Sequence, residues 1–85
     1  MVYSIELSKL ADRELRKLPR AIQEELGRII DSLAFNPRPA GCLKMKGQNN
    51  IWRIRTGDFR ILYTIKEDQL VIIVARIGNR REVYR

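Results

Sequence analysis

The sequence predicts a small α+β fold, in which an N-terminal strand and a two-helix hairpin precede a curved antiparallel sheet of three to four strands. Three observations predict it. Apolar residues repeat at helical spacing over residues 7–18 and again over 22–33. Prolines follow both stretches and end the helical pattern. After residue 50, three segments rich in Ile, Val and aromatic residues are separated by short polar turns. We expect the helices to cover one face of the sheet.

The first half of the chain contains the opening strand and both helices. Residues 2–7 are rich in β-formers, and Ser8 offers a side-chain oxygen to cap the helix that follows. This helix ends before Pro19. The second helix begins at Pro19 or Arg20 and stops at the sequence NPRP, residues 36–39.

The second half of the chain contains the sheet. Four strands are expected, over residues 43–46, 51–55, 60–65 and 70–77. The first is a short edge strand. Residues 56–58 and 66–69 suit tight antiparallel turns between the others. With 85 residues there is rarely material for a second core, so residues 1–85 are expected to form one domain.

The composition restricts the partners and the compartment. Seventeen Lys and Arg residues against ten Asp and Glu residues give a formal charge of +7, which favours a polyanion such as nucleic acid or an acidic protein. No signal peptide or membrane-spanning run is present, and a membrane partner is not expected. Because Cys42 is the only cysteine, no intramolecular disulfide can form. We expect a cytoplasmic protein.

The hairpin around Gly57 can close in two registers that differ by one residue, and the choice turns the whole strand over. If Arg55 pairs with Arg60, the apolar residues fall on one side: Trp52, Ile54, Ile61 and Tyr63. Arg53, Arg55 and Arg60 then share the side opposite the helices. Like charges opposite one another cost about 0.2–1 kcal/mol in a sheet, so this arrangement needs a reason beyond folding. The alternative is that the arginine stems pack along the sheet with their charged heads in water.

The C-terminal segment ARIGNRREVYR extends the same chemistry. It adds four arginines and an aromatic residue, namely Arg76, Arg80, Arg81, Tyr84 and Arg85. A basic surface with an aromatic side chain at its rim is typical of a nucleic-acid site, because a base can stack on the ring. Lys44 and Lys46 lie in the expected edge strand and are further candidates for binding RNA, together with Arg76, Arg81 and Arg85.

Five segments in a fixed order carry a family resemblance. They are LRKLP (15–19), NPRP (36–39), MKG (45–47), WRIRTGDFRILY (52–63) and RIGNRREVY (76–84). In this order the sequence resembles the RelE/ParE superfamily of bacterial and archaeal toxins from type II toxin–antitoxin modules. The resemblance covers essentially the whole chain. It implies the RelE-like, microbial-RNase-like version of the α+β fold and a RelB-like antitoxin as partner.

RelE-type members of this superfamily cleave mRNA in the ribosomal A site, whereas ParE-type members poison DNA gyrase. The resemblance places the RelE-type catalytic positions at Arg53, Arg55, Arg60, Arg80 and Tyr84. We therefore expect a ribosome-dependent mRNA endonuclease that inhibits translation, with the ribosome and mRNA as further partners. The alternatives are a ParE-like gyrase inhibitor and a non-catalytic RNA-binding or decayed toxin.

The residues restrict the mechanism of such a nuclease. The best-known RelE toxin has lysines where this chain has Arg53 and Arg55, and arginine, with a pKa above about 12, is a poor general base. Arg53, Arg55 and Arg60 suit phosphate binding and charge stabilisation. Arg80 is expected beside the leaving oxygen, and Tyr84 either stacks on a base or assists the 2′-hydroxyl. With no His and no carboxylates near the arginines, neither a metal nor a small-molecule cofactor is expected.

Overall fold

The computed structural model of the chain describes residues 2–47 and 50–79. Strand β1 (Ser4–Leu7) leads into helices α1 (Lys9–Arg16) and α2 (Arg20–Ser32). Four further strands follow, β2 (Leu43–Lys44), β3 (Ile51–Thr56), β4 (Phe59–Lys66) and β5 (Val71–Asn79). The predicted α+β class and the order of the elements are confirmed.

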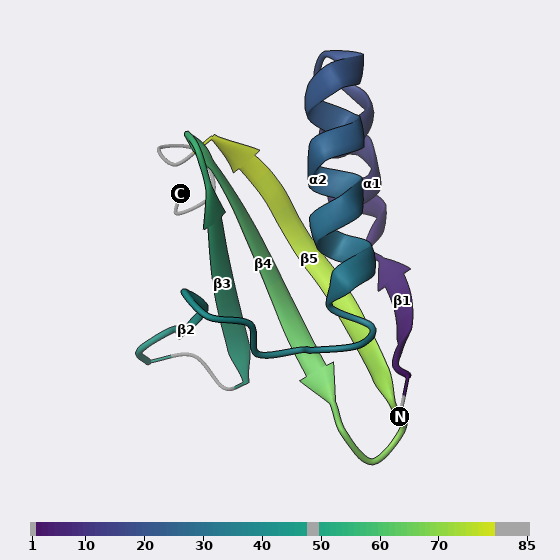
Figure 1. Cartoon of the computed structure of the whole chain (residues 1–85), viewed down its shortest axis with the longest axis vertical. Helices are drawn as coiled ribbons and strands as arrows, with labels where there is room; N and C mark the ends of the chain where they lie inside the picture. The colour runs from purple at the N-terminus through teal and green to yellow at the C-terminus, as the bar shows by residue number, and fades with distance from the viewer. Residues whose placement is uncertain (1, 48–49, 80–85) are drawn as a thin grey trace.

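The strands form one five-stranded sheet in the order β1-β5-β4-β3-β2 (Figure 1). The neighbouring pairs from β2 to β5 are antiparallel, as expected. Strand β1 pairs in parallel with β5, which makes the sheet mixed and larger by one strand than predicted. The sequence pattern marks β1 as a strand, but its partner lies far along the chain and leaves no local signal.

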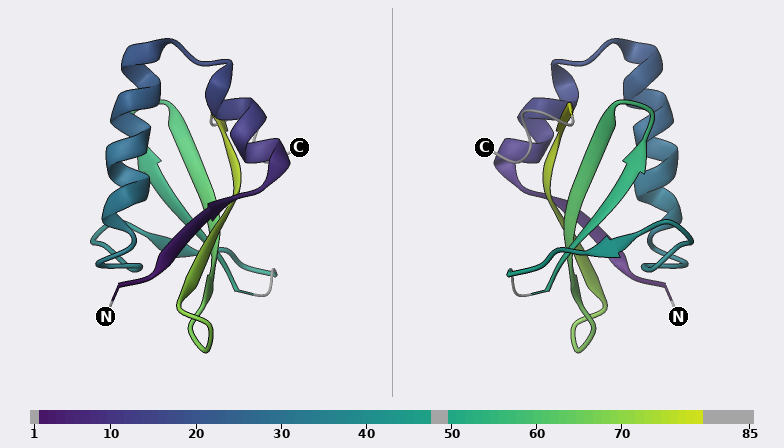
Figure 2. Two further views of the ribbon diagram at one scale, coloured as in Figure 1. Left: turned by 90° about the vertical axis from the view of Figure 1, so that its right-hand side faces the viewer. Right: turned by 90° about the vertical axis from the view of Figure 1, so that its left-hand side faces the viewer.

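The two helices form the predicted hairpin and lie on one side of the sheet (Figure 2). The Ser8 Oγ accepts the N–H of Ala11 at 3.0 Å and caps α1 as expected. Helix α2 begins directly after Pro19. The helices turn their apolar stripes toward the strands, burying Ala11, Leu26 and Ile30.

The core lies between the helices and the sheet. Its largest fully buried side chains come from α2, its C-terminal turn and the two long strands β4 and β5: Leu26, Leu33, Ile61, Tyr63, Ile72, Val74 and Ile77. Each such apolar side chain contributes about 1.5–3 kcal/mol through its removal from water. The proline-rich loop after α2 closes the same face, because the Tyr63 hydroxyl donates to the Pro37 carbonyl at 2.7 Å.

Candidate nucleic-acid interface

The hairpin between β3 and β4 has the predicted register. Arg55 lies opposite Arg60, Ile54 opposite Ile61 and Trp52 opposite Tyr63. The turn is tighter than expected, because Thr56 and Phe59 also pair and leave only Gly57 and Asp58 between the strands. Gly57 has φ +58°, a conformation that suits the first central position of a two-residue hairpin turn and favours glycine.

This register gathers arginines on the side of the sheet away from the helices. Residues directly opposite one another in an antiparallel pair point to the same face. Arg53 therefore shares a face with its partner Leu62, and Arg76 of β5 shares it because it too lies opposite Leu62. Arg55 and Arg60 belong to the same face. We call the surface formed by Arg53, Arg55, Arg60 and Arg76 the arginine face.

Arg60 stands at the centre of the arginine face. It lies between Arg55 on β3 and Gly78 on β5, and Gly78 has no side chain to cover it. Arg60 is nevertheless only 3 % exposed. Its Nη1 makes one long hydrogen bond of 3.5 Å to the Phe59 carbonyl, and its Nε has no hydrogen-bond partner within the described part of the chain.

A buried guanidinium with an unpartnered donor is costly, because it has given up water without a full replacement. Its planar fork presents parallel N–H groups that match the oxygens of a phosphate. Arg53, which is half-buried, and Arg55, which is exposed, lie on the neighbouring strand. The chemistry of Arg60 therefore suits an anionic partner that would take up its free N–H donor.

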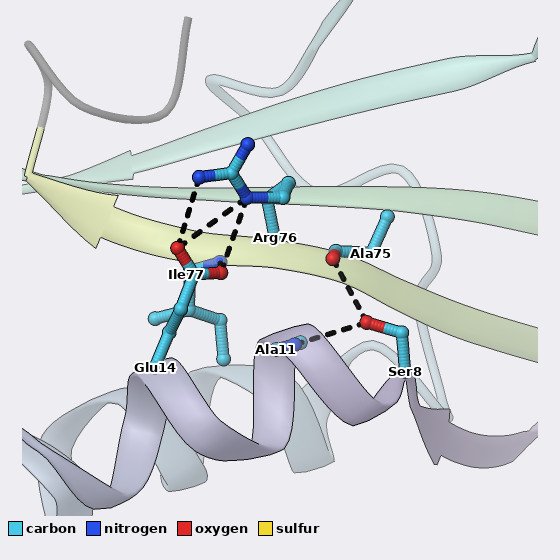
Figure 3. Close-up of polar contacts among 6 residues, drawn as sticks. All are labelled: Ser8, Ala11, Glu14, Ala75, Arg76 and Ile77. Carbon is cyan, nitrogen blue, oxygen red and sulfur yellow. Dashed lines mark hydrogen bonds and ion pairs between the residues drawn. The ribbon is translucent and has the colours of Figure 1, made fainter. Parts of the chain in front are cut away.

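Arg76 is already engaged within the protein. Its Nη2 donates to Glu14 Oε2 at 3.0 Å and its Nε donates to Glu14 Oε1 at 3.2 Å (Figure 3). The hydrogen bonds to Glu14 raise the pKa of Arg76 above its usual value. An RNA that used Arg76 would have to share it with this carboxylate. Sequence reasoning gave Glu14 no role, because its partner lies 62 residues away in the chain.

Of the other predicted RNA-binding residues, the structure assigns a side of the sheet only to Lys44. Lys44 lies opposite Trp52, which places it on the helix side of the sheet. Lys46 is exposed in the turn after β2. The remaining predicted site residues lie outside the described residues: Arg80, Arg81, Tyr84 and Arg85.

Residues 2–47 and 50–79 contain neither a candidate metal centre nor a candidate membrane span. No three His, Cys, Asp or Glu side chains gather there in a way that could hold a metal ion. Neither described helix is long and apolar enough to cross a membrane.

The protein is therefore a small α+β protein with a helical hairpin on one side of its sheet and a basic face on the other. Proteins of this class are suited to binding polyanions. Comparison with known proteins narrows the class. The family described as the ParE toxin of type II toxin–antitoxin systems, parDE, matches residues 5–84. The chain belongs to this family, and it is a toxin of the RelE/ParE superfamily, as the sequence motifs indicate.

Named relatives agree with this assignment. The chain is 30% identical to toxin RelE3 of Methanocaldococcus jannaschii, over 85% of this chain and 84% of that protein. It is 27% identical to the mRNA interferase toxin RelE of Escherichia coli, over 99% of this chain and 92% of that protein. The toxin in the archaeal RelE–RelB complex of Pyrococcus horikoshii has a similar structure, with a TM-score of 0.83 and 25% identity over 96% of this chain and 99% of that one.

Proposed function

We propose that this toxin is a metal-independent endoribonuclease that cleaves mRNA in the ribosomal A site and thereby inhibits translation. The observation that carries the proposal is Arg60, which is buried with an unpartnered Nε and lies opposite a second arginine, Arg55. Opposed arginines oppose folding, whereas a phosphate between them would stabilise both.

The reaction that these residues suit is attack by a ribose 2′-oxygen on its own phosphorus. The new bond joins the 2′-oxygen to phosphorus, and the bond from phosphorus to the 5′-oxygen breaks. Negative charge accumulates on the phosphorus-bound oxygens in between. Guanidinium donors aimed at those oxygens stabilise the transition state, and each typically contributes on the order of 10²–10³ in rate. Arg60, Arg55 and Arg53 take this role.

Two protons must also move. The 2′-hydroxyl loses one, and the departing 5′-oxygen gains one. We assign Arg80 to the departing oxygen and Tyr84 to the 2′-hydroxyl or to stacking on the adjacent base, because they match the C-terminal Arg and Tyr of RelE-type toxins. No arginine is an efficient base, because the guanidinium keeps its proton to above about pH 12. Catalysis therefore depends on the orientation of the RNA, which the ribosome would supply by holding the mRNA.

A second candidate function is inhibition of DNA gyrase, because the family that matches residues 5–84 is named for ParE toxins. The arginine face suits the phosphates of DNA as well as those of RNA. The Escherichia coli relative, whose match covers 99% of this chain, is named an mRNA interferase, and this name favours RNA over DNA as the target. We therefore rank the nuclease first.

The partner that restrains the toxin is proposed to be a RelB-like antitoxin. The Pyrococcus horikoshii relative was solved as a RelE–RelB complex, and this chain matches 99% of the toxin in it. A formal charge of +7 favours an acidic partner or one with an acidic segment. Such a partner would dock on the helical hairpin or block the arginine face.

Primer extension on mRNA after brief induction tests the proposed function. Cuts at codon-phased positions in translated messages are the expected result, and purified toxin should cut mRNA on translating ribosomes. Arg60→Met should abolish the cuts, whereas Arg13→Gln, which removes an equal charge from the exposed side of α1, should leave them. Intact mRNA combined with cleaved plasmid trapped on gyrase would instead establish the second candidate.

A further inference from the structure

Helix α1 takes over from β1 as the neighbour of β5. The parallel pairing of β1 with β5 ends at Leu7 and Val74, while β5 continues to Asn79. The outer edge of β5 beyond Val74 therefore lacks a strand partner within the described structure. An unpaired edge exposes N–H and C=O groups that need other partners.

The N-cap residue Ser8 and a side chain in the middle of α1, Glu14, supply partners for these groups (Figure 3). The Ser8 N–H donates to the Val74 carbonyl at 2.9 Å, and the Ser8 Oγ donates to the Ala75 carbonyl at 2.9 Å. One turn and a half further along, Glu14 Oε1 accepts the Ile77 N–H at 3.0 Å. Ser8 and Glu14 thus continue the ladder that β1 begins.

Strand β5 is irregular just before this edge, so the contacts that hold the edge in place matter for its position. The register between β4 and β5 shifts at Leu62 and Tyr63, so that Ala75 is skipped between Val74 and Arg76. A bulge of this kind bends the strand and increases its twist. The direction of β5 after the bulge is then set by whatever holds Arg76 to Asn79.

Glu14 holds that segment through both of its oxygens. In addition to the Ile77 N–H, it accepts hydrogen bonds from Arg76, and the two side chains are only 19% and 28% exposed. Nearby, α1 and the end of β5 separate around a groove of about 390 Å³ that Lys17, Leu18 and Asn79 help to line. The Ile77 side chain anchors this segment in the core, but Gly78 has no side chain and Asn79 is exposed, so the Glu14 hydrogen bonds add a polar anchor at the strand end.

The end of β5 is next to the centre of the arginine face. Gly78 lies opposite Arg60, one residue beyond the N–H that Glu14 binds, and Arg80 follows Asn79 directly in the sequence. We propose that Glu14 is a positioning residue for the arginine face. By binding the Ile77 N–H, it fixes the end of β5 beside Arg60. The proposal rests on the proposed nuclease function.

A positioning role has a specific kinetic signature. Loss of Glu14 releases Arg76 from its ion pair but removes no positive charge, and Arg53, Arg55 and Arg60 keep their places. The affinity for the anionic ribosome should therefore change little. The alignment of the reacting phosphate should suffer, and misplacement by about 1 Å can cost on the order of 10²-fold in rate. The maximum rate should therefore fall, while the toxin concentration at half-saturation should stay nearly the same.

The experiment is single-turnover cleavage of mRNA on stalled ribosomes, over a range of excess toxin. Glu14→Ala should lower the maximum rate by at least about tenfold, with half-saturation within about threefold of wild type. Glu14→Gln keeps an oxygen that accepts the Ile77 N–H and should recover to within about threefold. Asp12→Asn breaks the exposed ion pair with Arg16 on the same helix and is the matched control, with unchanged kinetics.

Glu14→Asp covers the case in which the alanine variant does not fold. It keeps the charge, but its side chain is one methylene shorter, so the Ile77 contact should weaken and the maximum rate should again fall. Wild-type rates in either Glu14→Ala or Glu14→Asp overturn the proposal. Equal losses in Glu14→Ala and Glu14→Gln, or an effect confined to half-saturation, overturn it as well.

Amide hydrogen exchange separates this proposal from the nuclease function on which it rests. The Ile77 amide should exchange faster in Glu14→Ala than in wild type, while the Ile72 amide within the sheet should not change. If wild type cleaves no mRNA, the proposed nuclease function fails. An Ile77 amide that exchanges at the same rate in both proteins would show instead that Glu14 does not hold β5.

Discussion

Arg55 and Arg60 lie directly opposite one another across β3 and β4, on the face of the sheet that carries no helix. Two like charges in this arrangement oppose strand pairing. The neighbouring positions in the same hairpin are apolar pairs such as Ile54 with Ile61, which support it. The hairpin thus combines a stabilising face with a destabilising one, as expected where a surface is kept for binding.

Replacing Arg55 should trade activity for stability. Threonine suits an exposed strand position and removes the repulsion, so Arg55→Thr should raise the free energy of unfolding by about 0.2–1 kcal/mol. The same variant should cleave ribosome-bound mRNA at least about tenfold more slowly, because one guanidinium donor is lost. Urea unfolding and single-turnover cleavage measure the two effects. Lower stability in Arg55→Thr would show that the opposed arginines do not repel.

Like Arg55→Thr, Arg60→Met should raise stability and slow cleavage, and both changes should be larger. Methionine fills the buried site without a polar group, so relief of the unpartnered Nε should raise the free energy of unfolding by about 1–3 kcal/mol. Cleavage should fall by about 10²–10³-fold. Phosphate should raise the melting temperature of wild type more than that of the variant, because it binds only where Arg60 is present. Equal shifts in both proteins would place the anion elsewhere.

The conformation of Gly57 predicts the tolerance of the turn. At φ +58° a side chain meets its own backbone, so Gly57→Ala should lower the free energy of unfolding by about 1–2 kcal/mol. Asparagine adopts this region more readily, and Gly57→Asn should therefore cost clearly less than Gly57→Ala. Apart from its two chain neighbours, no residue has an atom within 4 Å of a Cβ at this position, so tertiary crowding does not affect the comparison. Chemical denaturation of wild type, Gly57→Ala and Gly57→Asn measures the three free energies of unfolding. Equal losses of stability in the two variants would show that the backbone conformation of Gly57 does not set the cost.

Tyr63 predicts how the protein responds to alkali. Burial, and then the neighbouring Cys42, raise the pKa of Tyr63 above its usual value. In the unfolded chain the phenol loses its proton near about pH 10, whereas in the folded protein it keeps it. The unfolded state therefore binds fewer protons above about pH 10, and stability should be complete below that pH and fall above it.

Urea unfolding between about pH 7 and pH 11 tests this linkage. Tyr63→Phe should be less stable than wild type by about 1 kcal/mol at neutral pH, because the hydrogen bond to Pro37 is lost. Its stability should fall less steeply above about pH 10. Parallel curves for wild type and Tyr63→Phe would refute the role assigned to burial.

The local pattern of the sequence was sufficient for most elements and for the hairpin register. Ser8 marks the start of α1 and Pro19 its end through hydrogen bonds made or lost within a few residues. The alternation of Trp52, Arg53, Ile54 and Arg55 decides which face of β3 is buried, because successive side chains of a strand point in opposite directions. These signals are carried by neighbouring residues.

The same reasoning was less complete for the candidate site. It placed Arg53, Arg55 and Arg60 on one face, but the burial of Arg60 depends on how the sheet packs around it. It expected Lys44 to share the RNA surface, yet pairing with Trp52 turns that residue to the other side. A two-residue strand offers too short an alternation to reveal its facing.

By itself, then, the sequence determined the helices, their caps, the strand pairs of the hairpin and the gathering of arginines on one face, because each follows from spacing within a short segment. The tertiary structure alone decided that β1 joins β5 in parallel and that Glu14 binds Ile77 and Arg76 more than 60 residues away. Such contacts depend on the path of the whole chain, since the packing of the helical hairpin on the sheet brings α1 to the open edge of β5.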